Sequence, residues 1–346
     1  MKTTFLQDSD QLSSDSVSPS GSTSFLRPIT DELSMVEELL RNEIRSDVKA
    51  AYTISGHTLS AGGKRLRPAL VILAAKSALN EFPSRTIVAS AAAAELIHMA
   101  SLIHDDVVDG ASERRGKPTA NAEFGNQISV LVGDYLLAKS INLAAREGNL
   151  DVIREFSRVT IELSEGEVLQ IGAKGNPDTD SETYLQIVKM KTAGFIAGCC
   201  AIGGMLANAN PEQIHALRSY GISCGIAFQI ADDLLDYVGD PLVTGKAIDG
   251  DLREGKMTLP LILALSSADE SERQMVGRIV KSPHTIRESD VHSVHDLIVK
   301  NDGHLKAKAV ALNYLDSAEA SATLLPASIF RDSLVSLARF SVNRQN

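Results

Sequence analysis

Apolar residues recur three and four positions apart along almost the whole chain from about residue 29. This period places them on one face of a helix, whereas a strand would alternate them. Alternating β-branched runs between hairpin turns, the usual sign of strands, are scarce. Ala and Leu are abundant, Trp is absent and aromatics make up only 4% of the residues, which favours helices. The sequence therefore predicts an all-α fold.

The chain divides into a short tail and one large domain. Long helical patterns cover residues 86–109, 128–146, 156–173, 181–207 and 211–240, and breaks rich in Gly, Pro and Asp separate them. Hydrophobic residues make up 44% of the chain, enough for a substantial core. The first residues are Ser-rich and acidic. We predict a disordered tail over residues 1–28 and a single domain over residues 29–346.

Two copies of a DDxxD spacing lie within apolar helical runs, in LIHDDVVDG and IADDLLDY. A helix brings the three carboxylates of each copy into one arc, where like charges repel by about 0.2–0.5 kcal/mol per pair. No Lys or Arg lies beside the first copy, so a divalent cation is the expected partner, and oxygen ligands favour Mg²⁺. A solvated acidic face explains one copy about equally well, but explains two poorly. The candidate metal ligands are Asp105, Asp106, Asp109, Asp232, Asp233 and Asp236.

Basic residues accompany both acidic clusters. Each alone is more often a surface cation, but together with two metal sites they predict a pocket for diphosphate groups. Those in GGKRLRP follow a glycine pair that can expose backbone N–H groups. The candidates are Lys64, Arg65, Arg67, Arg114, Arg115, Lys191, Lys246 and Lys256.

These motifs, in this order, make the chain from about residue 29 resemble the trans-isoprenyl diphosphate synthases. The motifs are GGKRLRP, LIHDDVVD, ERRGKPTAN, VGDYLLA, EGEVLQ, KTA, AFQIADDLLDY and DLREGKMTLP. The resemblance implies a bundle of about ten or more helices around a deep central cavity. It also implies that the enzyme condenses isopentenyl diphosphate onto an allylic diphosphate.

The resemblance also assigns roles to individual residues. The six aspartates would hold Mg²⁺ ions, three per active site, on the allylic diphosphate, with Asp105, Asp106 and Asp232 central to catalysis. Thr192 and Gln229 would face the cationic centre. The allylic diphosphate would contact Arg114, Lys191 and Lys256, with Lys246 matching a further basic position. Isopentenyl diphosphate would contact Lys64, Arg67, His98 and Arg115. His98 taken alone is more often a core histidine; it lies seven residues before Asp105, on the same helical face.

Small residues near the first acidic cluster bear on product length. In the family, bulky residues four and five positions before this cluster stop the product at C15 or C20. Here these positions are Ser101 and Ala100, and the helix upstream contains the small residues 91–94. The resemblance therefore implies a C35–C50 product, most like octaprenyl diphosphate, a precursor of quinone side chains.

Charge and cysteine content limit the partners and the compartment. The net charge of −10 argues against nucleic-acid binding, which usually requires a basic surface. The three cysteines form no C-x-x-C pair, which suits the cytoplasm. The most apolar run, residues 193–207, is shorter than the roughly 18–20 residues of a membrane span, so we expect none. Release of a greasy product would favour peripheral membrane contact. The resemblance implies a homodimer, for which the run at 193–207 and its neighbouring helices are a candidate interface.

The sequence leaves other functions open. A short-chain synthase would need only a different pocket floor, and a partner-dependent subunit of a heteromeric synthase would share the fold. The His104–Asp105 pair also suggests a metal-dependent phosphohydrolase, although no matching histidine ligands are evident. A terpene cyclase usually lacks the second full DDxxD and the GGKRLRP motif.

Overall fold

The computed structural model describes residues 21–78, 84–114, 116–238 and 250–342. Helices form nearly all regular structure in these ranges, which confirms the all-α prediction. The exception is a two-residue antiparallel ladder, β1 (Glu113–Arg114) with β2 (Lys117–Pro118). The predictions for residues 1–20, for Arg115 and for Lys246 lie outside the described residues.

The helices begin and end close to the predicted breaks. In chain order they are η1 (Gly21–Ile29, 3₁₀), α1 (Thr30–Glu43), α2 (Lys49–Ser60), α3 (Leu66–Ala78), α4 (Ser84–Val108), α5 (Ala120–Phe124), α6 (Asn126–Arg146), α7 (Leu150–Ala173), α8 (Ser181–Val188), η2 (Lys189–Ala193, π), α9 (Gly194–Leu206), α10 (Pro211–Val238), α12 (Gly250–Arg253), α13 (Leu259–Leu265), α14 (Glu270–Lys281), η3 (Pro283–Thr285, 3₁₀), α15 (Glu288–Lys300), α16 (Gly303–Thr323) and α17 (Ile329–Val342).

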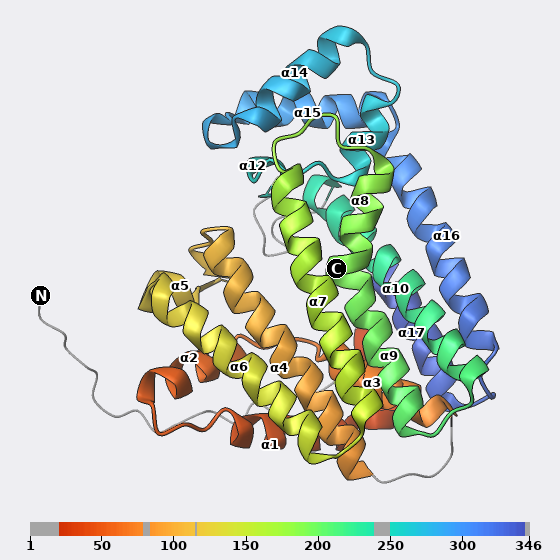
Figure 1. The fold of residues 1–346 in the computed structure, drawn as a ribbon. Helices are drawn as coiled ribbons and strands as arrows, with labels where there is room; N and C mark the ends of the chain where they lie inside the picture. The colour runs from red at the N-terminus through yellow and green to blue at the C-terminus, as the bar shows by residue number, and fades with distance from the viewer. Residues whose placement is uncertain (1–20, 79–83, 115, 239–249, 343–346) are drawn as a thin grey trace, which may run out of the picture.

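The long helices pack side by side as a bundle, and α14 and α15 lie across one end of it (Figure 1). The most extensive contacts join α10 to α16 and α9, α4 to α6, and α3 to α9. Two clusters of buried apolar side chains result. One lies mainly among α1, α3, α4, α9 and α17, and the other among α8, α10 and α13 to α16. Helix α4, which carries the first acidic cluster, packs in the first of these clusters, whereas α10 contributes to both: its N-terminal half to the first and the half with the second acidic cluster to the other.

Glycines in α9 and α10 allow unusually close packing. A Cβ added at Gly203 would lie 2.4 Å from the carbonyl oxygen of Val71 in α3, and one at Gly221 would lie 2.4 Å from the Cα of Ala197. Residues 194–204 of α9 are all buried within the chain. The proposed dimer interface on the run 193–207 itself is therefore wrong, because that run is already covered by α3, α7 and α10.

Three helical segments among the described residues are long and apolar enough to cross a membrane by length and composition. They are Arg85–Val108, Asn126–Arg146 and Ser181–Leu206. The expectation of no membrane span rested on residues 193–207, a run shorter than each of these segments. Packing accounts for the first, because 78% of its apolar window is buried inside the bundle, whereas only 39% of the Asn126–Arg146 window is. The second segment, α6, therefore leaves apolar surface exposed.

The predicted boundary between tail and domain at residue 28 falls inside η1. Phe25 and Leu26, on the tail side of that boundary, are buried, and the Phe25 ring lies 5.3 Å from the ring of Phe340 in α17. Packing therefore begins earlier than residue 29.

Candidate active site

The first acidic cluster occupies the last turn of α4. The N–H of Asp109 donates to the carbonyl of Asp105 at 2.8 Å, so the helical spacing expected from the sequence extends to the third aspartate. Gly110, with φ of +64°, then ends the helix. Lysine and arginine from elsewhere reach this cluster: Arg114 Nε donates to Asp106 at 2.8 Å, and Lys174 Nζ to Asp109 at 2.7 Å. Part of the expected cationic compensation therefore comes from the protein itself.

Of the three carboxylates, Asp105 has the surroundings least favourable to its negative charge. Burial raises its pKa to about 6, and the carboxylates of Glu167 and Asp109 act in the same direction, against the opposing charge of Lys191. For Asp109, burial also disfavours the charged form, but the hydrogen bond from Lys174 and the charge of Lys256 outweigh it and lower the pKa. A further cation beside Asp105 would relieve its repulsion.

The second acidic cluster lies near the end of α10, and its members have different surroundings. Asp233 is 4% exposed and accepts hydrogen bonds from Tyr184 Oη at 2.5 Å and Gln229 Nε2 at 2.8 Å. Its pKa is nevertheless raised, because burial and the charge of Asp251 outweigh these bonds. Asp236 accepts from the N–H groups of Gly250 and Asp251 at 3.2 and 3.0 Å, so it holds the start of α12.

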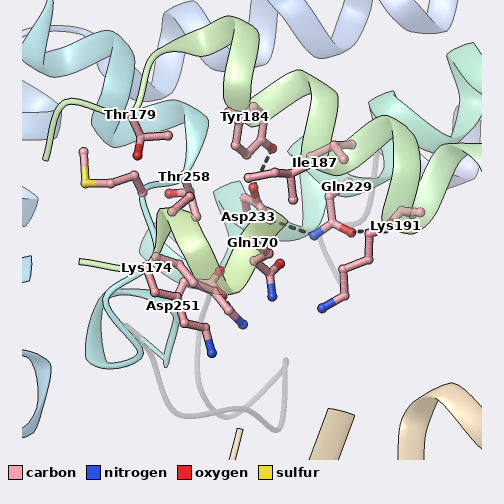
Figure 2. A pocket seen from close by; sticks show the side chains of 15 residues that line it. Gln170, Lys174, Thr179, Tyr184, Ile187, Lys191, Gln229, Asp233, Asp251 and Thr258 are labelled. Carbon is pink, nitrogen blue, oxygen red and sulfur yellow. Dashed lines mark hydrogen bonds and ion pairs between the residues drawn. The ribbon is translucent and has the colours of Figure 1, made fainter. Parts of the chain in front are cut away.

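A hydrogen-bonded row connects this cluster to the KTA motif (Figure 2). Thr192 Oγ1 donates to Gln229 Oε1 at 2.9 Å, and Gln229 in turn donates to Asp233. Because the hydroxyl proton is used in this bond, the lone pairs of Thr192 remain available for a positive charge. Thr192 and Lys191 both lie in the π-helical turn η2, which the sequence did not predict.

The row borders a cavity of about 140 Å³. Three lysines reach it, each beside a carboxylate: Lys174 with Asp109, Lys191 with Glu167, and Lys256 with Glu254 at 2.6 Å. Charges of both signs in a partly closed cavity suit an anion that arrives with metal ions. The lining residues are Gln170, Ala173, Lys174, Thr179, Tyr184, Ile187, Val188, Lys191, Thr192, Gln229, Asp233, Asp251, Lys256, Met257 and Thr258.

The GGKRLRP segment has a strained backbone that leads into α3. Gly62 and Arg65 have φ of +73° and +47°. Arg65 forms ion pairs with Glu37 in α1 and Glu95 in α4, the latter at 2.9 Å, and these fix the segment against the helix of the first acidic cluster. Arg67 stacks on the ring of Phe195 at 4.9 Å. Burial lowers its pKa, against the opposing charges that include Asp105.

The predicted residues therefore divide into two sets. The cavity brings together Lys191, Thr192, Gln229, Asp233 and Lys256, with Asp105 and Asp109 interacting with its lysines. Its lining does not include Lys64, Arg67, His98, Ala100 or Ser101. Lys64 Nζ lies 4.2 Å from the ring centre of Phe340, and the Ser101 hydroxyl donates to the His98 carbonyl at 2.9 Å.

Sequence reasoning missed other residues at the cavity. Gln170 and Glu167, which pairs with Lys191 of the cavity, lie three residues apart in the EGEVLQ motif of α7, so helical spacing could have found them. Lys174, the first residue after α7, follows Gln170 by four residues. Tyr184 gave no such signal, since a tyrosine in an apolar helix is usually a core residue.

All six predicted metal ligands lie in the part of the chain that the structure describes. Within it, no three His, Cys, Asp or Glu side chains converge as a ready-made metal site. The donor chemistry nevertheless fits a hard divalent cation, because the clusters offer carboxylate oxygens and Asp105 lies among like charges. The three cysteines, in contrast, are all buried, as expected for small core residues.

Comparisons with known proteins identify the family of the chain. A family model described as polyprenyl synthetase matches residues 48–298. An all-trans-nonaprenyl-diphosphate synthase (geranyl-diphosphate specific) from Rhodobacter capsulatus is 38% identical over 92% of this chain and 97% of its own length. Octaprenyl diphosphate synthase from Escherichia coli (strain K12) is 35% identical over 90% and 96%.

A solved structure shows the same fold. Polyprenyl synthase from Caulobacter crescentus CB15, complexed with calcium and isoprenyl diphosphate, matches with a TM-score of 0.89 and 35% identity over 95% of this chain and all of that one. The chain therefore belongs to the polyprenyl synthetase family, and is a prenyltransferase of the trans-isoprenyl diphosphate synthase type.

Proposed function

We propose that the protein is an all-trans-polyprenyl diphosphate synthase that adds isopentenyl units to an allylic diphosphate, with Mg²⁺, to give a C35–C50 product. The observation that carries this proposal is the cavity beside Asp233 of the second acidic cluster, where Lys174, Lys191 and Lys256 lie next to carboxylates and the Thr192–Gln229 pair. The hydrogen bond from Lys174 to Asp109 connects this cavity to the first acidic cluster. Such a site matches a diphosphate leaving group and a cation formed beside it.

Mg²⁺ ions, three per site, would be held by the aspartates of α4 and α10 and would supply positive charge for the leaving diphosphate. Asp105, Asp106, Asp109, Asp232 and Asp233 are the direct ligands in this proposal. Asp236 contributes by holding α12, which leads to the loop of Lys256. Arg114, Lys191, Lys256 and Lys246 hold the allylic diphosphate, and Lys64, Arg67, His98 and Arg115 hold isopentenyl diphosphate.

The proposed reaction consists of ionisation, carbon–carbon bond formation and loss of a proton. The allylic C–O bond breaks and its electron pair leaves with the diphosphate. The double bond of isopentenyl diphosphate forms a C–C bond to the allylic carbon, and the positive charge moves to the former double bond. Loss of a proton to a diphosphate oxygen restores a double bond and gives a chain five carbons longer. Thr192 directs lone pairs at the developing charge, because its proton is held by Gln229.

The cavity of about 140 Å³ accommodates a diphosphate group but not a chain of this length. We therefore place the growing chain along α4, beside the small residues Ser101, Ala100 and those at 91–94. Each helical turn of about 5.4 Å corresponds to roughly one isoprene unit. Octaprenyl diphosphate, for quinone side chains, is our preferred product, and the octaprenyl and nonaprenyl relatives support this range.

We also propose a cytoplasmic homodimer, with peripheral membrane contact when product leaves. Large apolar side chains are exposed on α6 and α7, where a second copy would cover them. They include Ile128, Leu131, Ile141, Ile161 and Val168.

A phosphohydrolase is the main alternative chemistry, and the contacts of His104 weigh against it. His104 Nε2 lies 3.1 Å from the carbonyl oxygen of Val130 and 3.5 Å from Asp134 of α6. The ring thus packs against α6 at Gly133 and is engaged there.

The test is the substrate dependence of pyrophosphate release. We expect release when farnesyl diphosphate, isopentenyl diphosphate and Mg²⁺ are all present, and background release when any is omitted. Release from farnesyl diphosphate alone would instead indicate a hydrolase. Release that appears only after a second polypeptide is added would indicate a subunit of a heteromeric synthase.

A further inference from the structure

Resting on the proposed function, we propose that Lys174 is an additional binding residue for the allylic diphosphate, which it reaches by leaving Asp109 when substrate and metal ions bind. Lys174 is the first residue after α7 and is 23% exposed in its side chain. It lines the same cavity as Lys191 and Lys256. In Figure 2 the side chains of Lys174, Gln170 and Lys191 point toward the same side of that cavity.

The backbone fixes Lys174 next to Lys256. The N–H of Gly175 donates to the carbonyl of Gly255 at 2.8 Å, and each glycine is the neighbour in sequence of one of the two lysines. Both glycines have positive φ, +73° and +71°, which L residues adopt rarely. A Cβ at Gly255 would also lie 3.1 Å from the carbonyl oxygen of Val280. The backbone conformation of these two segments therefore keeps Lys174 and Lys256 close together.

The two lysines share one carboxylate. Glu254 Oε2 lies 2.6 Å from Lys256 Nζ and 3.9 Å from Lys174 Nζ. Any diphosphate that reaches Lys256 therefore comes within the range of the Lys174 side chain, which is long and flexible. An ammonium group has three N–H donors, so it can bond a phosphate oxygen as it moves away from Asp109.

The present partner of Lys174 explains why it would move. Asp109 belongs to the acidic cluster that we assign to metal ions, and its bond to Lys174 is 2.7 Å long. A metal ion on Asp109 and an ammonium group in contact with it repel one another. Metal binding therefore favours release of Lys174 toward the incoming anion, while without metal Lys174 neutralises Asp109.

The test uses the full chain and three variants, Lys174→Met, Lys174→Arg and the control Lys76→Met. Lys76 is also an ion-paired lysine, bound to Glu32, and is 19% exposed, but it lies on α3 away from the cavity. Calorimetry would measure the binding of Mg²⁺ alone and of inorganic pyrophosphate in the presence of Mg²⁺. Steady-state kinetics would give KM separately for farnesyl and isopentenyl diphosphate.

We expect Lys174→Met to weaken the binding of pyrophosphate and to strengthen the binding of Mg²⁺ alone. Pyrophosphate should bind about tenfold more weakly, as should farnesyl diphosphate by KM, because a charged hydrogen bond is lost. Mg²⁺ alone should bind more tightly, because Asp109 is released, and KM for isopentenyl diphosphate should stay unchanged. Lys174→Arg should retain most of the pyrophosphate affinity, and Lys76→Met should match the wild type.

Two results would overturn the inference. If Lys174→Met binds pyrophosphate as the wild type does, Lys174 is only a structural partner of Asp109. If it weakens Mg²⁺ and pyrophosphate binding equally, the side chain supports the site without contacting the anion. Failure of the wild type itself to bind pyrophosphate or to elongate farnesyl diphosphate would instead reject the proposed function, and the inference with it.

Discussion

Asp105 shows at the scale of one residue how the site is prepared for a cation. Its carboxyl group has a pKa of about 6, against an ordinary value of 3.8, because burial and two neighbouring carboxylates disfavour its charge. The folded chain therefore binds a proton there more tightly than the unfolded chain does. Above pH 6 the ionised carboxylate of Asp105 lowers the free energy of unfolding. This loss disappears as the pH falls toward 4, where the group is protonated in both the folded and the unfolded chain.

Asp105→Asn should therefore stabilise the metal-free protein while abolishing its activity. At pH 7.5 in EDTA we expect a gain of up to about 3 kcal/mol in the free energy of unfolding, shrinking toward zero near pH 4. Urea unfolding of both proteins at a series of pH values measures this.

Asp106→Asn is the matched control, for which we expect a decrease in the free energy of unfolding. It removes the charged acceptor of Arg114 and should cost about 1 kcal/mol. If Asp105→Asn were destabilising at pH 7.5, the charge repulsion inferred at this residue would be wrong.

At the scale of elements, the π-helical turn η2 depends on a glycine in the neighbouring helix. A Cβ at Gly166 of α7 would lie 2.8 Å from Met190 Cβ and 2.9 Å from the backbone nitrogen of Lys191. Both are part of η2, the turn that presents Lys191 and Thr192. The close approach of α7 therefore sets where these two side chains point.

Gly166→Ala should shift η2, with a loss of about 1–3 kcal/mol in stability and a fall in kcat. Gly172→Ala in the same helix meets no atom within 4 Å, so it should be neutral or stabilising by up to about 1 kcal/mol through helix propensity. Thermal unfolding and steady-state rates compare the two. Equal effects of the two substitutions would show that the contact with η2 is unimportant.

The other prediction for an element concerns α4. Ser101→Phe places a large ring one turn before Asp105, in the path that we assign to the growing chain. We expect the main product to shorten to C15–C20, with turnover retained, when the labelled products are separated by length. An unchanged product distribution would place the chain elsewhere.

The elements also show what could be predicted from sequence. The period of apolar residues located α4, α6 and α10, because burial on one face imposes that period directly. It could not show the π turn at Lys189–Ala193, which arises from the approach of α7. Nor could it show that Arg114 and Lys174 contact the first acidic cluster, because folding brings them there from 8 and 65 residues away.

The roles of the six aspartates differ for the same reason. Their spacing is the same in both motifs, and nothing local distinguishes them. In the structure Asp233 is buried beside Tyr184, whereas Asp236 holds the start of α12. Such differences depend on residues far away in sequence, including Tyr184, which only tertiary packing identifies.

At the scale of the whole molecule, the exposed apolar side chains of α6 and α7 predict a homodimer. Leu131 is 67% exposed and lies three residues after the exposed Ile128, on the same face of α6. Leu131→Glu should produce a monomer in sedimentation velocity runs, where the wild type should sediment as a dimer. Leu324→Glu, at a leucine that is 71% exposed beyond α16, should remain dimeric. A monomeric wild type, or a dimeric Leu131→Glu variant, would contradict this assignment of the interface.

We propose that the protein elongates a prenyl chain whose diphosphate lies in the cavity lined by α7, α8, η2 and α10. Product analysis tests it most directly: purified protein, farnesyl diphosphate and labelled isopentenyl diphosphate, with Mg²⁺ or with EDTA, followed by separation of the dephosphorylated alcohols by length. We predict C35–C50 alcohols that form only with Mg²⁺. No labelled alcohol from farnesyl or any shorter allylic primer, with Mg²⁺ present, would contradict the claim.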